Sequence, residues 1–272
     1  MINNRPIVHA LIPSRGGSKS IPKKNIRRYN KYPLLIHSIK TAHSEPIIKR
    51  VVVSTDCLET KAIALENDAD VPFLRPNDIS GDYSTDLECF QHYIGWLKTM
   101  GQELPDIIVH LRPTYPERDE DLLHDCLSKF LNVKDEYSSL RTVVPIEKSL
   151  FKMYTIDGKS NTLKCTYKEY NGVKEPYNHV RQLLPTTYLH NGCIDIIKRE
   201  TIEKGSVTGD KIYAYIMPKE ETYDIDTEED WKRSLATKIS NGQHGIQRSK
   251  PIDIPVSLKI KKKENECYFQ TY

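Results

Sequence analysis

Short apolar runs alternate with amphipathic stretches along the first 145 residues, and this pattern predicts an α/β fold. Runs typical of buried strands fall at residues 7–12, 47–53, 71–74, 107–111 and 141–145. Between them, apolar residues recur at helical spacing over about 33–43, around 62–65, around 87–97, and over 119–131. Strands and helices that alternate in this way indicate a three-layer, Rossmann-like architecture, in which a mostly parallel sheet carries helices on both faces.

The alternation stops after residue 145. Residues 146–188 are rich in tyrosine, lysine and turn formers, and Asp157-Gly158 predicts a hairpin there. Strands return at 193–197 and 212–216, followed by a helix through Trp231 and Leu235. We therefore expect an α/β domain of residues 1–145 and 189–240, an insertion of residues 146–188, and a polar tail of residues 241–272 whose order the pattern does not define.

The loop after the first apolar run carries the most distinctive chemistry. It reads PSRGGSKSIPKKN over residues 13–25, and its glycines, Gly16 and Gly17, allow backbone N–H groups to approach a ligand closely. The cations of this loop are Arg15, Lys19, Lys23 and Lys24. Amides and cations at the end of a strand form a site for phosphates. A solvated basic turn is the alternative, because neither G-x-x-x-x-G-K-[ST] nor G-x-G-x-x-G is present.

Two aspartates near the end of the α/β pattern form a candidate metal site. Asp224 and Asp226 flank one residue in YDIDTEED, so on an extended segment both side chains point to the same face. Mg²⁺ typically takes one or two protein carboxylates and completes its shell with water and substrate phosphate. Helix capping by Asp226 or Thr227 is the simpler interpretation, and both roles can coexist. Asp56 presents a similar choice between a helix cap, which we favour, and a catalytic role.

Bulk properties limit the alternatives. A chain of 272 residues with net charge +3 carries too little excess charge to indicate nucleic-acid binding. No apolar run approaches the roughly 20 residues that span a bilayer, and the N-terminus lacks the apolar core of a signal peptide. The six cysteines are scattered without a C-x-x-C pair, which favours a reducing compartment. We expect a cytoplasmic protein with no membrane partner.

The loop motif resembles the N-terminal signature of the acylneuraminate cytidylyltransferase family, the CMP-sugar synthetases. The DIDT segment is similar to the metal-binding segment of the same family, and the resemblance extends over about residues 6–238. It implies transfer of CMP from CTP to a sialic-acid-like or other 2-keto sugar acid, with Mg²⁺ as cofactor and pyrophosphate as product. It assigns phosphate and ribose contacts to Arg15, Gly16, Gly17, Ser18, Lys24 and Asn25 and metal binding to Asp224 and Asp226, so that the catalytic set is Arg15, Lys24, Asp224 and Asp226.

Residues 73–86 resemble the family segment that wraps the cytosine and ribose. FLRPNDISGDYSTD is similar to its F-x-R-P motif and following turn, which implies nucleotide contacts by Arg75 and Ser84. A planar guanidinium suits that purpose because it donates several hydrogen bonds in one plane. Asp86 stands where the family usually has serine, so the match is partial. A surface role for Arg75 is the alternative.

Two segments resemble the sugar-binding segments of the family. One lies directly after the strand expected at residues 107–111, and the other directly before the strand expected at residues 193–197. Arg112 and Thr114 stand in a segment similar to L-Q-P-T-S-P, with arginine where sialate-activating members usually have glutamine. Arg112 either faces a carboxylate or phosphate of the substrate or pairs with a neighbouring acid such as Glu117 or Asp119. The remaining sugar contacts implied by the resemblance are Arg181, Gln182 and Asn191. By itself, Asn191-Gly192 would be an ordinary tight turn.

The resemblance also implies that residues 146–188 form a dimerisation arm and that the protein is a homodimer. Two other functions stay open at this stage. One is a nucleotidyltransferase that acts on a sugar 1-phosphate. Two departures from the sialate pattern make it worth testing: arginine at position 112 in place of glutamine, and leucine at position 189 where the family commonly has arginine. The other is a non-catalytic nucleotide-sugar binding protein, against which the retained Lys24, Asp224 and Asp226 argue.

Overall fold

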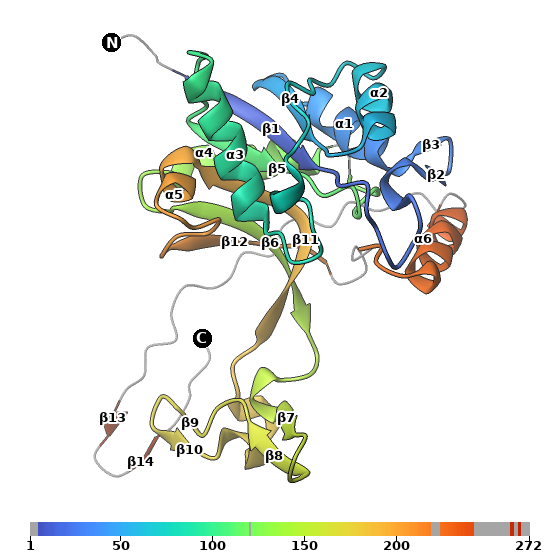
Figure 1. The fold of residues 1–272 in the computed structure, drawn as a ribbon. Helices are drawn as coiled ribbons and strands as arrows, with labels where there is room; N and C mark the ends of the chain where they lie inside the picture. The colour runs from blue at the N-terminus through green and yellow to red at the C-terminus, as the bar shows by residue number, and fades with distance from the viewer. Residues whose placement is uncertain (1–4, 120, 219–223, 242–261, 264–265, 268–272) are drawn as a thin grey trace. The chain divides into compact units, whose positions relative to one another are not determined.

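The computed structural model describes residues 5–119, 121–218, 224–241, 262–263 and 266–267. A six-stranded sheet runs in the order β12-β6-β11-β5-β1-β4 (Figure 1). Its strands are β1 (Val8–Pro13), β4 (Ile48–Ser54), β5 (Ile107–His110), β6 (Ser139–Ile146), β11 (Thr187–Lys198) and β12 (Ile212–Ile216). Strand β1 runs parallel to both β4 and β5, whereas β11 is antiparallel to β5. The expected α/β fold is confirmed, with a sheet that is mostly parallel but mixed.

Helices cover both faces of this sheet. They are α1 (Leu34–His43), α2 (Leu58–Leu65), α3 (Asp86–Thr99), α4 (Leu122–Val133), α5 (Arg199–Glu203) and α6 (Glu228–Asn241). On one face, α3 and α5 pack on the buried side chains of Leu11, Val52 and Ile108. The strand residues that point to the opposite face are buried as well, and α1 contacts β1 and β4 on that face. Helix α4 lies beside α1, since His124 contacts Glu45 just after α1 at 3.0 Å.

Two of the longest helices begin with side-chain caps. Thr85 accepts a hydrogen bond from the Glu88 amide at 3.3 Å, and Glu88 accepts one from the Thr85 amide at 2.6 Å, which is a capping box. At α6, the Asp230 amide donates to Thr227 Oγ1 at 3.1 Å and the Thr227 amide donates to Asp230 at 2.9 Å. The cap at Thr227 is one of the two that the sequence predicts for α6.

The strand expected at residues 71–74 is wrong. Asp70 forms a single parallel bridge with Val52, and the chain then leaves the sheet edge. Pro72 has no N–H with which to extend a ladder. Phe73 instead packs edge-on against His92 of α3, with ring centroids 4.4 Å apart. The Phe73 side chain therefore packs against the hydrophobic core beside α3.

Two expected local features are also corrected. Cys57 is the N-cap of α2 and makes no side-chain capping bond, so Asp56 does not cap this helix. Asn191-Gly192 is not an isolated tight turn but lies inside the long strand β11, where Gly192 has φ +73°. This left-handed conformation is one that glycine adopts without strain.

The described residues divide into two compact units. Unit 1 comprises those within Met1–Thr142, His190–Tyr215 and Thr222–Arg248, and unit 2 those within Val143–Leu189 and Ile216–Glu221 together with the described pieces of the C-terminal tail. In unit 2, β7 (Tyr154–Asp157) pairs antiparallel with β8 (Thr162–Cys165), which confirms the hairpin at Asp157-Gly158. The domain boundaries and the role of the insertion stay predictions.

The remaining elements are short. They are the paired strands β2 (Arg28–Tyr29) and β3 (Tyr32–Pro33), β9 (Glu169–Tyr170) and β10 (Val173–Lys174), β13 (Lys262–Lys263) and β14 (Glu266–Cys267), with 3-10 turns η1 (Lys24–Ile26), η2 (Asn77–Ile79), η3 (Leu150–Lys152), η4 (Pro176–Asn178) and η5 (Arg181–Leu183). Most of the predicted tail, residues 241–272, lies outside the described residues. Within the described part of the chain, every helix is too short or too polar to cross a membrane.

Candidate active site

A polar cleft of about 410 Å³ opens in unit 1 at the carboxyl ends of β1 and β5. This is the position at which open α/β sheets bind ligands. Its lining comes from the loop after β1, the segment before α3, the segment after β5 and the approach to α6: Pro13, Arg15, Ser18, Lys19, Ser20, Lys24, Asn25, Arg75, Ile79, Asp82, Ser84, Thr85, Asp86, His110, Arg112, Pro113, Thr114 and Asp226. Most of the residues predicted for nucleotide binding therefore meet in one cavity.

Lys24 joins the first loop to the aspartate segment some 200 residues later. Its Nζ donates to the Ile225 carbonyl at 2.9 Å and to Asp226 Oδ1 at 3.0 Å. The side chain is only 11% exposed, so the ammonium group lies in the cleft rather than in open solvent. Asn25 steadies the same loop by donating from Nδ2 to the Arg15 carbonyl at 3.1 Å. Lys24 thus brings a largely buried positive charge into contact with the Asp226 carboxylate inside the cleft.

Arg15 and Lys19 share one carboxylate at the mouth of the cleft. Arg15 Nη1 contacts Asp82 Oδ1 at 2.9 Å, and Lys19 pairs with the other oxygen of Asp82. Hydrogen bonds from Lys19 and then Arg15 lower the pKa of Asp82. Asp82 therefore occupies donors that a phosphate group would need.

The glycines of the first loop lie differently from the expectation. The Gly16 amide donates to Asp56 Oδ1 at 2.9 Å, so this N–H is already engaged. A Cβ at Gly16 would approach the Cβ of Cys57 to 2.8 Å, so the position requires glycine for packing. Neither Gly16 nor Gly17 lines the cleft. The structure supports a loop-shaping role for Gly16, and it assigns Asp56 to holding that loop.

Arg75, which the resemblance assigns to nucleotide binding, is one of the residues that line the cleft. Its side chain is buried, with the residue 7% exposed, and its backbone is fixed by the Arg75 amide donating to the Thr55 carbonyl at 2.7 Å. Among the described residues, Nε and Nη2 of Arg75 have no hydrogen-bond partner. Both Arg75 and Ser84 line the cleft. These two nitrogens are themselves buried, so a contact of Arg75 with a ligand in the cleft would fall to other atoms of its side chain.

Arg112 is held by two carboxylates, those of Asp86 and Asp195. We call this part of the cleft the inner wall. Nη1 donates to Asp195 Oδ2 at 2.8 Å and to the Gly192 carbonyl at 3.4 Å, while Nη2 donates to Asp86 Oδ2 at 3.1 Å. An acid therefore does pair with Arg112, but Glu117 and Asp119, the partners suggested by proximity in sequence, are wrong. The observed partners come from α3 and β11.

Asp195 is the centre of a buried charge network. Besides Arg112, it accepts hydrogen bonds from Arg141 Nε at 2.8 Å and contacts His190 Nε2 at 3.0 Å and His110 Nδ1 at 3.6 Å. Burial by itself would raise the pKa of Asp195, but hydrogen bonds from the two histidines and the charge of Arg112 together hold it well below the usual value. Asp195 thus stays charged and fixes the Arg112 guanidinium.

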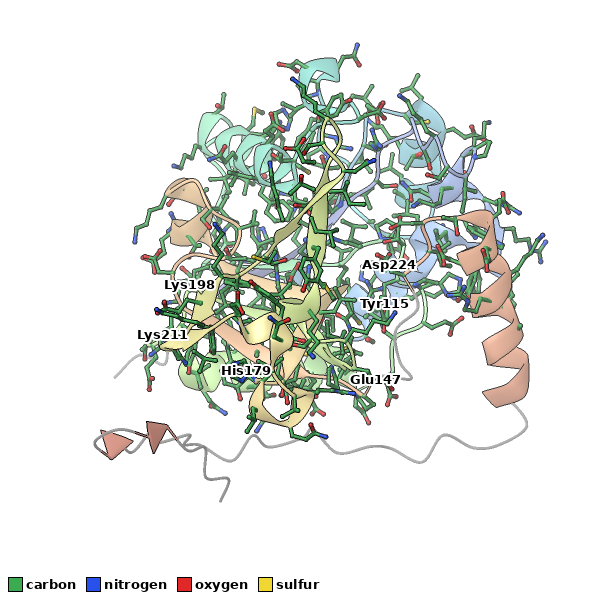
Figure 2. All side chains as sticks on the ribbon, turned by 90° about the horizontal axis from the view of Figure 1, so that it is seen from below. Tyr115, Glu147, His179, Lys198, Lys211 and Asp224 are labelled. Carbon is green, nitrogen blue, oxygen red and sulfur yellow. The ribbon has the colours of Figure 1, made fainter. Side chains whose placement is uncertain are left out.

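The two aspartates of the DID segment lie beside the segment after β5. The Ile225 amide donates to the Thr114 carbonyl at 2.8 Å, which brings Asp224 close to Tyr115 (Figure 2). Burial and then the nearby Asp226 carboxylate raise the pKa of Asp224, against a hydrogen bond from Thr114 that lowers it. The described residues contain no group of three or more histidine, cysteine or acidic side chains placed for a metal. A pair of carboxylates still fits Mg²⁺, which needs only one or two from the protein.

Three predicted sugar-binding residues are not part of the lining of this cleft. Arg181 and Gln182 line a separate pocket of about 400 Å³ within unit 2, together with Glu147 and Thr187. Asn191 is buried in β11, where its Oδ1 accepts from Thr142 Oγ1 at 2.7 Å and from the Cys193 amide at 3.2 Å. These bonds give Asn191 a structural role in the sheet instead of a direct place in the cleft.

Sequence reasoning missed Asp82, Asp195 and the pairing of Asp86 with Arg112. Asp195 had one visible signal, because a charged residue inside the apolar strand CIDII must be paired when buried. Asp82 had none, since it stands in a loop rich in turn formers.

Comparison with known proteins identifies the class to which this fold and cleft belong. The family model described as "Cytidylyltransferase" matches residues 9–170. The chain therefore belongs to the cytidylyltransferase family, and the resemblance predicted from its motifs is confirmed.

Individual relatives give this family assignment more detail. A pseudaminic acid cytidylyltransferase of Campylobacter jejuni is 32% identical over 156 residues, which cover 55% of this chain and 67% of the relative. N-acylneuraminate cytidylyltransferase A of Danio rerio is 30% identical, over 82% of this chain and 49% of the relative. The structure of a CMP:2-keto-3-deoxy-manno-octonic acid synthetase complexed with CTP matches with a TM-score of 0.61 at 14% identity, over 86% of this chain and 99% of that one, which supports the fold.

Proposed function

We propose that this cytidylyltransferase transfers CMP from CTP to a sugar acid and releases pyrophosphate. The observation that carries the proposal is the convergence of Arg15, Lys24 and Asp226 in one cleft at the ends of β1 and β5. Similarity to enzymes named for pseudaminic, acylneuraminic and diacetyllegionaminic acids favours a sugar acid of that kind as the acceptor.

The first loop binds the triphosphate in this proposal. Arg15 and Lys24 neutralise its charge, and Ser18 and Asn25 stand in the same lining as further hydrogen-bonding groups. An acceptor hydroxyl oxygen attacks the α-phosphorus, the bond from that phosphorus to the oxygen of the β-phosphate breaks, and pyrophosphate leaves. The hydroxyl proton passes to solvent. Cations fixed around the phosphates lower the barrier because negative charge develops there.

Asp224 and Asp226 would hold Mg²⁺ beside Lys24. The carboxylates are hard oxygen ligands, and the two lie close together, since partial desolvation and then the neighbouring Asp226 carboxylate raise the pKa of Asp224. When bound, the ion would neutralise phosphate charge and lower the pKa of the attacking hydroxyl. Lys24 itself restrains Asp226 by their 3.0 Å contact, which orients that carboxylate.

The acceptor would lie on the side of the cleft formed by Arg112 and Thr114. Because Asp86 and Asp195 already neutralise Arg112, its guanidinium is a fixed part of the wall and a weaker anion receptor than a free arginine. Arg181 and Gln182 are proposed to contact the acceptor from residues 146–188 of a second copy.

A homodimer through residues 146–188 is part of the same proposal. The large apolar side chains of this segment that are exposed are Met153, Tyr154, Ile156, Leu163, Tyr167, Val180, Leu183 and Tyr188, and Leu189 just past its end is exposed as well. Such a concentration of exposed apolar surface favours association. Sedimentation of the chain and of a variant with Ile156→Asp and Leu163→Asp tests it, with a dimer expected only for the unmodified chain.

Pyrophosphate release with Mg²⁺, each nucleoside triphosphate, and a panel of sugar acids and sugar 1-phosphates tests the function. Release with CTP and a sugar acid is expected. Release only with a sugar 1-phosphate would replace the acceptor class, and CTP binding without release across the panel would favour a non-catalytic binding protein.

A further inference from the structure

We propose that Ile225 is the positioning residue of the candidate metal site, and that its buried side chain sets the direction of the aspartates on either side of it. This role rests on the proposed binding of Mg²⁺ by Asp224 and Asp226. The feature that supports it is a small apolar cluster of unit 1, which joins the first loop to α6 and has no part in the proposed transfer itself.

The side chain of Ile225 is buried between two exposed neighbours. Ile225 is 0% exposed, whereas Asp224 and Asp226 are both exposed. Successive side chains of an extended segment point to opposite sides, and the exposure of these three residues follows that alternation. The burial of Ile225 on one side therefore directs the two carboxylates to the other side.

Ile225 packs into a cluster whose other members come from the first loop, β2, α1 and α6. We call it the α6 cluster, and its buried members are Ile225, Ile21, Tyr29, Leu34 and Trp231. The Tyr29 and Trp231 rings meet edge to face with centroids 5.6 Å apart, where α6 lies beside β2 and β3 (Figure 1). The α6 cluster thus fixes the helix that follows the aspartates against the loop proposed to bind the triphosphate.

The backbone of Ile225 is fixed as well. Its amide donates to the Thr114 carbonyl at 2.8 Å, and its carbonyl accepts from Lys24 Nζ at 2.9 Å. At the other end of Lys24, the backbone amide donates to the carbonyl of Ile21, a second member of the α6 cluster, at 3.1 Å. Ile225 is therefore held by its side chain and by both backbone polar groups, and it connects the aspartates to Lys24.

The cap of α6 leaves the Asp226 carboxylate available to the cleft. Thr227 and Asp230 cap the helix with each other's amides, and Asp226 lines the cleft, where its carboxylate contacts Lys24 at 3.0 Å. Groups that orient metal ligands affect metal affinity although they do not touch the ion. In this chain the orienting group is an apolar side chain that stands between the two candidate ligands.

The test follows Mn²⁺ binding to the full chain with CTP by electron paramagnetic resonance, without an acceptor and therefore without turnover. We expect Ile225→Ala to weaken Mn²⁺ binding by about tenfold, because the residue that orients both ligands loses its packing. Ile225→Val, which removes one methyl group, should weaken it less. Ile202→Ala is the matched control, since Ile202 is equally buried but packs in the core beside α3. Both alanine variants should lower the free energy of unfolding, but only Ile225→Ala should lower Mn²⁺ affinity.

An unchanged Mn²⁺ affinity in Ile225→Ala would overturn the positioning role, and so would an equal loss of affinity in Ile202→Ala. If Ile225→Ala does not fold, Ile225→Val and Ile202→Val are compared by the same two criteria. Mn²⁺ binding to the unmodified chain with CTP that is no tighter than binding to CTP alone would also overturn it. Failure of the proposed transfer has a different signature, namely Mn²⁺ binding that depends on Ile225 while no acceptor yields pyrophosphate.

Discussion

The mouth and the inner wall of the cleft are both built from cation–carboxylate pairs, but the two differ in burial. At the mouth, Lys19 has a side chain 80% exposed and shares Asp82 with Arg15. On the inner wall, Asp195 is 2% exposed and receives Arg112 together with Arg141. Exposed pairs contribute little and exchange readily, whereas a buried charge deprived of its partner is costly. At the mouth, Arg15 and Lys19 can therefore exchange Asp82 for phosphate. The inner wall is suited to keeping a fixed shape.

The largest effect that this contrast predicts is on stability, at the buried network. Asp195→Asn should lower the free energy of unfolding by about 3 kcal/mol or more, because it leaves Arg112 and Arg141 without their common anion. The pKa of Asp195 is depressed in the folded chain. Charged Asp195 therefore contributes its full stabilisation at pH values above its pKa in the unfolded chain, near 3.8. This stabilisation is lost as the pH falls through the lower pKa of Asp195 in the folded chain.

Chemical denaturation at neutral pH and at successively lower pH measures this change. The matched variant is Asp82→Asn, which removes an equally charged but more exposed residue and should alter stability little. If both variants lowered stability equally, the distinction between mouth and wall would be lost.

The next effect is on turnover, at the lysine that joins the first loop to the aspartate segment. Lys24→Met should lower kcat/KM by roughly 10²–10³-fold, because one preorganised positive group is removed from the reacting phosphates. Lys23→Met is the control, since Lys23 pairs with Glu59 outside the cleft lining and should stay within about twofold. Pyrophosphate release measures both, and a loss no greater in Lys24→Met than in Lys23→Met would remove Lys24 from the site.

A smaller change is expected at the proposed metal ligands. Asp226→Asn should raise the Mg²⁺ concentration for half-maximal rate on the order of tenfold, because one hard ligand loses its charge. Glu229→Gln, on the exposed first turn of α6, serves as the control. Titration of Mg²⁺ at saturating CTP reads out the effect. An identical Mg²⁺ response in both variants would contradict the metal role.

The smallest effect is a gain at the mouth. Asp82→Asn should tighten CTP binding up to about fivefold at low salt. In this variant Arg15 and Lys19 no longer have to break ion pairs with the Asp82 carboxylate before they bind phosphate. The gain should shrink as ionic strength rises. Calorimetry at two salt concentrations would show it, and weaker binding of CTP would mean that Asp82 supports the ligand instead of competing with it.

The sequence allowed the local parts of this site to be predicted, and the reason is physical. Strand β1, its loop and the helix α1 follow from periodicity and turn chemistry within some 35 residues. The wall depends on pairs that are far apart in the chain, such as Arg112 with Asp195, which are 83 residues apart. The segment 71–74 misled because its apolar pattern resembled a strand, while Pro72 prevents the ladder. Side-chain partners across the sheet are set by tertiary packing, which no local pattern records.

A crystal structure of the chain with Mg²⁺ and a non-hydrolysable CTP analogue tests the central claim most directly. We expect Arg15 and Lys19 to leave Asp82 for the phosphates, while Arg112 keeps its bonds to Asp86 and Asp195. Phosphates bound away from the first loop, or an Arg112 that abandons both carboxylates for the ligand, would contradict it.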